Sequence, residues 1–346
     1  MNDLGHEALS NVFKRLLIDE KWSSRRERSF SWIGSRLAQA ITASHPTKDG
    51  DFMLTRLVAE CVVIESVTAS EELVYAVLSQ VNKHAIGNCY TYYPSDRCIY
   101  STTSTWIHEE TASWRTDIFS AYAIGQLVLA EAEADFLAEK CAGRVAVRQH
   151  PSSGFRTDRD DMLNALGDIF IPDGQEKSRF INEFEFKTVE DIARESPFAA
   201  TIGGDKTGIA LETSFANHTS LSLLKSDTKH RLLGSGLVGS THVPTDITED
   251  GGNRIAAVLN RKEREGATST KHYGAWCVDM APSRGIAVTY NFFVPNRLYR
   301  SGLIMDAAYG CIGRARWVDL VLNAEVTPPS AWDNLLRRFG FSSDKN

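Results

Sequence analysis

The sequence predicts an α+β protein made of two tandem units, each an antiparallel sheet with helices packed on one face. The chain has 346 residues, which exceeds the roughly 100–200 residues of a typical domain. A short pattern of residue types occurs twice along it. Around each copy, β-branched segments and helical patterns follow one another in the same order, and separate strands and helices of this kind are typical of an α+β sandwich.

The repeated pattern is short, but it keeps its order and its spacing. Residues 89–99 and residues 277–286 share Cys, Pro, Ser, Arg and Ile in that order once Asp96 is treated as an insertion. A helical segment precedes each copy, and a long helical pattern containing Ala-Tyr follows each one. This agreement favours a duplication, and it predicts that Pro94 and Pro282 lie in equivalent hairpin turns.

The first unit is predicted over residues 29–145, after an N-terminal helical segment of residues 1–28. Thr68 resembles a helix N-cap, because Glu71 three residues later completes a capping box. Periodicity and β-branched content predict the other elements: a helix over residues 30–41, a strand over 61–67, a hairpin over 90–93 and 99–106, and a long helix over 111–140.

The second unit is predicted over residues 207–326, between a turn-rich linker of residues 146–206 and a C-terminal helical tail of residues 327–346. Within the linker, the aromatic stretch 180–186 is expected to be ordered and to pack on the second unit. The same signals predict its elements: strands over residues 209–215, 220–224 and 232–240, a helix over 249–265, a hairpin over 276–293, and a helix over 298–322.

Composition excludes several classes of protein. The net charge of −6 argues against a nucleic-acid-binding protein, which is usually strongly basic. The six cysteines include no C-x-x-C pair, so we expect buried, reduced thiols and no metal site. The N-terminus is too polar for a signal peptide, and the longest nearly apolar run, residues 121–130, is about half of the ~20 residues that span a membrane. We therefore expect a soluble cytoplasmic protein without a membrane partner.

Four motifs suggest chemistry, but each has a plainer interpretation. Residues 203–207 resemble a phosphate-binding loop, yet Asp205 stands where a glycine is needed and a strand follows. Residues 234–239 have the wrong glycine spacing for a nucleotide site and indicate a bulge or a close backbone approach. His108 and its two following glutamates suit the start of a helix. The basic, aromatic segment 21–36 could contact phosphates and stack a base, but solvated charges with aromatics entering the core are favoured.

The residues Ser101, Thr102, Thr103, Ser104 and Thr105 form the least usual element. Such a run suits a pleated strand but offers no apolar face. We therefore expect an edge strand that polarity keeps soluble, and edge strands can bind an extended peptide through backbone hydrogen bonds. This strand is the candidate peptide-binding site, and the sequence points to no catalytic, cofactor-binding or metal-binding residue.

The second copy carries a further resemblance in a set of short motifs: Gly234–Leu237, Val243–Pro244, Ala257–Glu263, Gly274–Cys277 and Phe293–Asn296. In the first copy Trp32–Gly34 and the helical pattern of residues 114–137 add to it. With these motifs the chain resembles the actinobacterial tandem proteins related to type III secretion chaperones and YbjN-type domains, over about residues 28 to 325.

The resemblance implies a cytoplasmic binding fold without cofactor or catalytic centre, which holds peptides or partly unfolded protein segments in a secretion or bacterial conflict system. We therefore expect a non-catalytic chaperone or adaptor with a peptide or protein client. Two other interpretations stay open: a regulatory protein that binds a small ligand or nucleic acid, and an enzyme whose site has no familiar motif.

Overall fold

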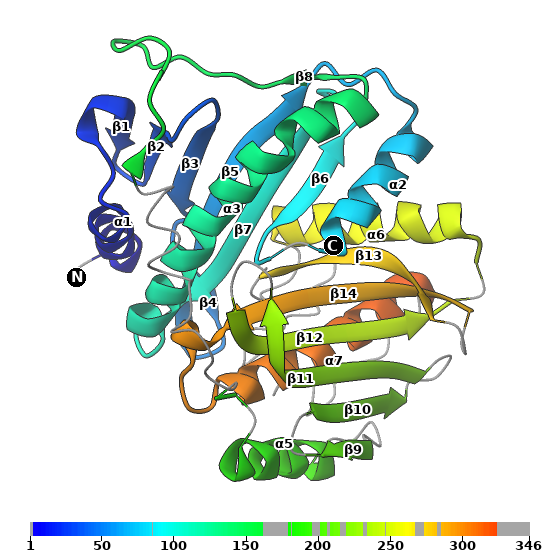
Figure 1. Ribbon diagram of the computed structural model, residues 1–346. Helices are drawn as coiled ribbons and strands as arrows, with labels where there is room; N and C mark the ends of the chain where they lie inside the picture. Colours follow the sequence, from blue (N-terminus) through cyan, green and yellow to red (C-terminus); the bar gives the residue numbers. More distant parts are fainter. Residues whose placement is uncertain are drawn as a thin grey trace.

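The computed structural model shows an α+β protein with two separate antiparallel sheets (Figure 1). It describes residues 3–84, 86–161, 179–180, 182–195, 201–205, 208–214, 219–230, 234–245, 247–266, 273–281 and 285–323. In Figure 1 the strands of the first sheet run steeply across the upper half of the molecule, and those of the second sheet lie across the lower half.

The first sheet has the strand order β1-β2-β3-β5-β7-β6, and β4 and β8 pair with the two ends of the long strand β5. All its pairings are antiparallel. The strands are β1 (Ser23–Arg26), β2 (Ser29–Ile33), β3 (Ala38–Ala43), β4 (Thr47–Asp49), β5 (Phe52–Glu65), β6 (Cys89–Tyr93), β7 (Cys98–Ile107) and β8 (Arg144–Val145).

The second sheet has the strand order β13-β14-β12-β11-β10-β9, again entirely antiparallel. Its strands are β9 (Thr201–Asp205), β10 (Gly208–Ser214), β11 (Thr219–His230), β12 (Gly234–Pro244), β13 (Gly274–Ala281) and β14 (Gly285–Pro295).

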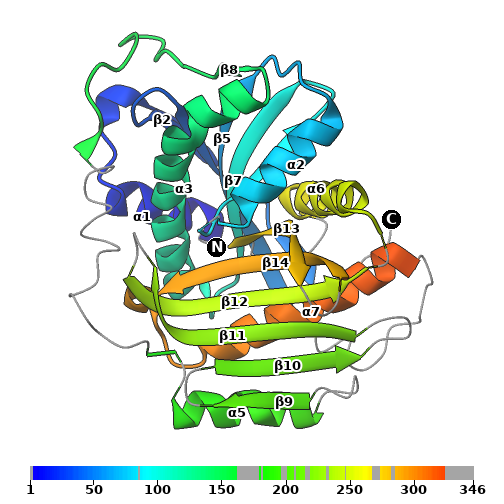
Figure 2. The ribbon, with the colours of Figure 1, turned by 45° about the vertical axis from the view of Figure 1, so that its right-hand side comes forward.

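One long helix lies across a face of each sheet (Figures 1 and 2). Helix α3 packs on β5 and β7, and helix α7 packs on β11 and β12. Two shorter helices, α2 and α6, lie against each other between the sheets. The helices are α1 (Leu4–Arg15), α2 (Glu71–Asn82), α3 (Ala112–Lys140), α5 (Glu183–Glu195), α6 (Glu249–Glu265) and α7 (Leu303–Asn323), with short 3₁₀ turns at Glu20–Trp22 and Asn296–Leu298.

The two units share one topology, which supports the predicted duplication. Reading each sheet from its inner end, β6-β7-β5-β3-β2-β1 corresponds to β13-β14-β12-β11-β10-β9. In both units a short helix precedes the terminal hairpin and a long helix follows it. Pro94 lies in the connection between β6 and β7, whereas its predicted equivalent Pro282 lies outside the described residues.

The inner edges of both sheets are closed by side-chain amides. The amide of Asn82 donates to the carbonyl oxygen of Tyr90 in β6 (3.0 Å) and accepts from its N–H (2.8 Å). Asn260 in α6 makes the same two bonds with Trp276 in β13, both at 2.8 Å. Each asparagine therefore satisfies backbone groups that a further strand would otherwise pair.

Two local predictions in the first unit are wrong. Residues 30–41 form strands β2 and β3 rather than a helix. The apolar residues whose spacing predicted the helix, Phe30, Ile33, Leu37 and Ile41, lie in β2, in β3 and in the segment between them. In β3 buried and more exposed side chains alternate, as expected for a strand. The N-cap of α2 is Ser70, whose Oγ accepts from the N–H of Leu73, while Thr68 donates to the carbonyl oxygen of Ala142.

The predicted boundaries also differ from the observed elements. Residues 1–28 include α1 as expected, but also β1, which belongs to the first sheet. The linker of residues 146–206 contributes α5 and β9, and its Phe180 ring packs edge-on against Tyr299 at 5.3 Å, so the expected contact with the second unit is present. The tail of residues 327–346 lies outside the described residues. Among the helices that the structure describes, none combines the length and the apolar character needed to cross a membrane.

Candidate functional site

The predicted peptide-binding strand is not at an edge. Strand β7, which contains Ser101 to Thr105, pairs with β5 on one side and with β6 on the other. All five side chains are 0–1% exposed. The edge prediction is therefore wrong, because the polar residues are buried in the middle of the sheet and no client strand can pair there.

One face of β7 is covered by α3. The amide of Gln126 donates to the carbonyl oxygen of Ser101 (2.9 Å) and to the Sγ of Cys61 (3.1 Å). Its Oε1 accepts from Gln39, which in turn accepts from the indole of Trp32 at 2.9 Å. This chain of buried amides and a thiol explains how polar residues are tolerated beneath the helix.

The opposite face of β7 is covered by the second unit. Arg56 in β5 donates to Ser104 (3.2 Å) and to the last carbonyl oxygens of α6, those of Glu263 and Arg264, at 2.9 and 2.7 Å. Burial lowers the pKa of Arg56 to about 10, so it remains charged at neutral pH. A buried cation at the C-terminus of α6 interacts favourably with the helix dipole and stabilises the junction between the units.

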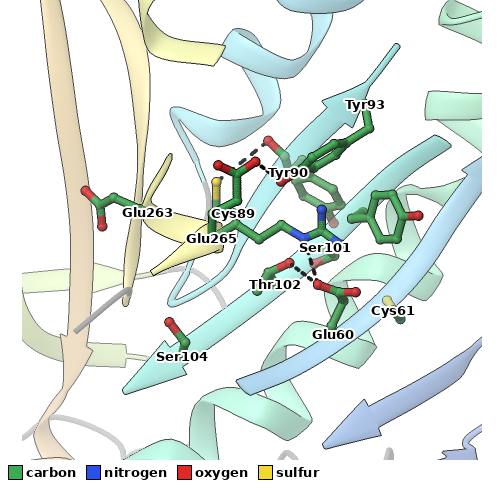
Figure 3. Close-up of polar contacts among 12 residues, drawn as sticks. Glu60, Cys61, Cys89, Tyr90, Tyr93, Ser101, Thr102, Ser104, Glu263 and Glu265 are labelled. Atoms are coloured by element: carbon green, nitrogen blue, oxygen red, sulfur yellow. Dashed lines mark hydrogen bonds and ion pairs between the residues drawn. The ribbon is translucent and has the colours of Figure 1, made fainter. Parts of the chain in front are cut away.

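The same junction also contains an ion pair (Figure 3). Arg264 donates to Glu60 at 2.7 Å, and its guanidinium stacks on Tyr93 and Tyr100 with ring-centroid distances of 4.3 and 3.9 Å. Figure 3 shows Thr102 beside Glu60, so the Thr102 side chain lies on the face of β7 that is turned toward the ion pair. Small hydroxyl side chains on β7 thus let α6 approach closely, which is the structural reason for the Ser/Thr run.

The cysteines do not form a reactive centre. Five are buried and Cys98 is partly exposed. Burial raises the pKa of Cys61 and of Cys277 to about 12, and that of Cys141 to about 11. These thiols are protonated at neutral pH, and a protonated thiol is a poor nucleophile. In the described part of the chain, no three His, Cys, Asp or Glu side chains are grouped so that they could hold a metal ion.

For the remaining sequence motifs, the structure supports the plainer interpretation. Arg28 binds backbone carbonyls of residues 43 and 44, and Arg36 pairs with Glu131 and Asp135. In the glycine-rich segment 234–239, a Cβ on Gly236 would collide with the carbonyl oxygen of Val294, so the predicted close backbone approach is confirmed. Residues 203–205 belong to strand β9 rather than to a helix start.

A cavity of about 450 Å³ lies where the two units meet. The first turns of α3 and α7 both line it, together with the start of β5 and the ends of β4 and β7. In Figure 1 the lower end of α3 lies beside the orange segment that leads into α7. Aromatic and aliphatic side chains make most of the wall: Phe52, Leu54, Trp106, Trp114, Leu303 and Met305.

Arg115 is the buried charge of this cavity. It is 7% exposed, donates to the carbonyl oxygen of Trp106 (2.7 Å) and lies 3.6 Å from Asp306 of the second unit. His108, set aside in the sequence as part of a helix start, also lines the cavity and stacks against Phe52 at 4.7 Å. Nothing in the sequence singles out Arg115. Its helix carries several other charged residues, so one arginine near its start is no signal of a site.

The outer edge of the second sheet is its remaining notable feature. Strand β9 pairs with β10 and is contacted by helix α5, and no other strand in the described part of the chain pairs with it. The outer edge of the first sheet, β1, is partly covered, because the Nε2 atom of His150 lies 3.2 Å from the carbonyl oxygen of Ser23.

Comparison with known proteins adds no relative: no family model, no curated protein and no solved structure matches this chain.

Proposed function

We propose that the chain is a non-catalytic adaptor or chaperone that binds an extended peptide or protein segment along the outer edge of β9. The proposal rests on one difference between the edges of the two sheets. The inner edges are closed by Asn82 and Asn260, and β7 is central, whereas β9 has a strand neighbour on one side only among the described residues.

The ladder between β9 and β10 defines which backbone groups are available. Asp205 pairs with Gly208, and the register continues to Thr201 and Glu212. In an antiparallel ladder the residues alternate between pointing their N–H and C=O toward the partner and away from it. Asp205 and Gly208 face each other at the two ends of the short connection between β9 and β10. The N–H and C=O groups of Ile202 and Gly204 therefore point away from β10. A client strand can pair with these groups by strand addition.

The rest of the molecule supports a binding role rather than a chemical one. The buried ionisable side chains of the junction are engaged in holding the units together, as Arg56 and Arg264 show. The buried Glu263–Arg314 pair instead joins α6 to α7 within the second unit. The tandem arrangement of two antiparallel sheets also agrees with what the chaperone resemblance implies.

A library of extended peptides displayed on phage tests the proposal. Selection on the full chain should enrich a peptide whose affinity falls by roughly 10-fold or more in Ile202→Pro, because proline removes an outward N–H while the ladder with β10 is retained. Arg25→Pro on β1 is the matched control, since it changes the other outer edge in the same way, and it should leave the affinity unchanged.

Hydrogen exchange of the wild-type complex provides an independent measurement. Bound peptide should slow the exchange of the amides of Ile202 and Gly204. A selected peptide that binds Ile202→Pro as tightly as wild type, or a library from which the full chain enriches nothing, contradicts the proposal.

A further inference from the structure

The cavity between the units has the features of a small-molecule site, separate from the strand edge proposed above. Its volume of about 450 Å³ lies within the range of ligand pockets, and most of its wall is apolar. It is formed by equivalent helices of the two units, α3 and α7, whose first turns both face it. A ligand there would contact both copies of the duplicated fold.

Two helix N-termini at one cavity favour a negative charge. The first turn of a helix exposes N–H groups and carries about half a positive charge. Helix α3 has no acidic residue in its first turn, and its N-cap residue Thr111 accepts no capping hydrogen bond from the helix. Helix α7 has Asp306 in its first turn. The field of α3 is therefore not offset by an acid of its own first turn.

Arg115 supplies the second, independent indication. It lines the cavity while its side chain is 9% exposed, and its Nε atom has no hydrogen-bond partner among the described residues. Among the described residues its ion-pair partner is Asp306 at 3.6 Å, which is long for a charge-assisted hydrogen bond. Burial lowers the pKa of Arg115 to about 10, so the group is charged at neutral pH. Its charge is only partly satisfied within the protein.

The other charged groups at the cavity do not remove this preference. Glu110 is exposed at the rim, where solvent screens it. Asp49 lies on β4 and is partly buried. Arg300 adds a second cation and pairs with Asp117 at 3.2 Å. The first turn of α3 and Arg115 thus both line a cavity whose wall is mostly apolar.

We propose that this cavity binds a small carboxylate with an aromatic or aliphatic body. The carboxylate pairs with Arg115 at the first turns of α3 and α7, and the body lies against Trp106, Trp114 and Met305. The neutral imidazole of His108, beside Phe52, is positioned at the same wall to exchange a hydrogen bond with the ligand.

Calorimetric titration of the full chain with 2-naphthoate and with octanoate tests the proposal, with 2-naphthamide and octanamide as uncharged partners of the same shape. At least one acid should bind saturably, with a dissociation constant on the order of 1 mM or tighter. The acid should bind roughly 10-fold more tightly than its amide, because a charge-assisted hydrogen bond to Arg115 is lost in the amide.

Two variants locate the site. Met305→Trp fills the cavity without changing a charge and should weaken acid binding at least about 10-fold. Arg115→Met should remove the preference for acid over amide, and circular dichroism shows whether it folds; if it does not, Met305→Trp decides alone. Arg144→Met, an exposed change on β8, is the matched charge control. Absence of saturable binding, equal affinity of acid and amide, or wild-type affinity in Met305→Trp each overturns the proposal.

Discussion

The side-chain amides of Asn82 and Asn260 make the same pair of hydrogen bonds in the two units. This relationship sets the correspondence between the copies: Tyr90 is equivalent to Trp276. The sequence pattern instead aligned Cys89 with Cys277, two residues out of register. Cys89 and Ala275, which precede the two bonded residues, are equivalent and are packed against each other where the units meet.

Replacing Asn260 with Leu should lower the free energy of unfolding by about 3 kcal/mol, because the N–H and C=O of Trp276 are then buried without partners. Urea unfolding at neutral pH measures the change. Asn11→Leu, on an exposed position of α1, is the control and should stay within about 0.5 kcal/mol of wild type. An equally small effect at both sites would show that the edge of β13 does not depend on the amide.

Thr103→Pro tests the central position of β7. Proline removes a backbone donor from a strand that pairs on both sides, so we expect a loss of about 3 kcal/mol or more in the free energy of unfolding. The loss should appear as a lower urea midpoint or as failure to fold. A variant with wild-type stability would mean that β7 has a free edge after all. Arg25→Pro on the edge strand β1 gives the comparison.

The buried pair between Glu263 and Arg314 should be costly to break. Glu263 accepts from the Nε and Nη2 atoms of Arg314, each at 3.0 Å, and from the indole of Trp276 at 2.7 Å. Burial alone would lower the pKa of Arg314, but the carboxylate outweighs it and raises that pKa. Glu263→Leu leaves an unpaired buried cation, so unfolding experiments should show a loss of about 3–5 kcal/mol.

A double variant provides the control for this pair. Adding Arg314→Met to Glu263→Leu removes the unpaired charge and should recover part of the lost stability. The exposed pair of Arg194 with Asp191 gives the comparison, since Arg194→Ala should cost less than about 1 kcal/mol. If the double variant is no more stable than Glu263→Leu, the cost does not arise from the buried charge.

His108 should make the protein less stable in mild acid. Burial, with a smaller effect from Arg115, lowers its pKa below the usual 6.5. As the pH falls below 6.5, the unfolded state takes up a proton before the folded state does, so the free energy of unfolding decreases. In His108→Gln the decrease between pH 7 and about pH 5.5 should be smaller than in wild type. Chemical unfolding across this range measures it, and an identical pH dependence would contradict the assignment.

The sequence by itself determined the elements whose signals are local. The helices at 112–140 and 249–265, the hairpin around Pro94, and the order of elements in the second unit follow from periodicity, caps and turn residues. The two-unit organisation was predicted from a repeated pattern. A duplicated fold keeps the order of its elements even where the sequence pattern aligns the two copies a few residues out of register.

Only the tertiary structure decided what surrounds each element. The Ser/Thr run of β7 has the composition of an exposed edge, yet Gln126 of α3 covers one face and Arg56 with the end of α6 covers the other. The cavity likewise arises from residues of both units, with Arg115 and Asp306 far apart in the chain. A local sequence pattern reports the conformational preference of its own segment. Burial between two units depends instead on contacts with residues that are far away in the sequence.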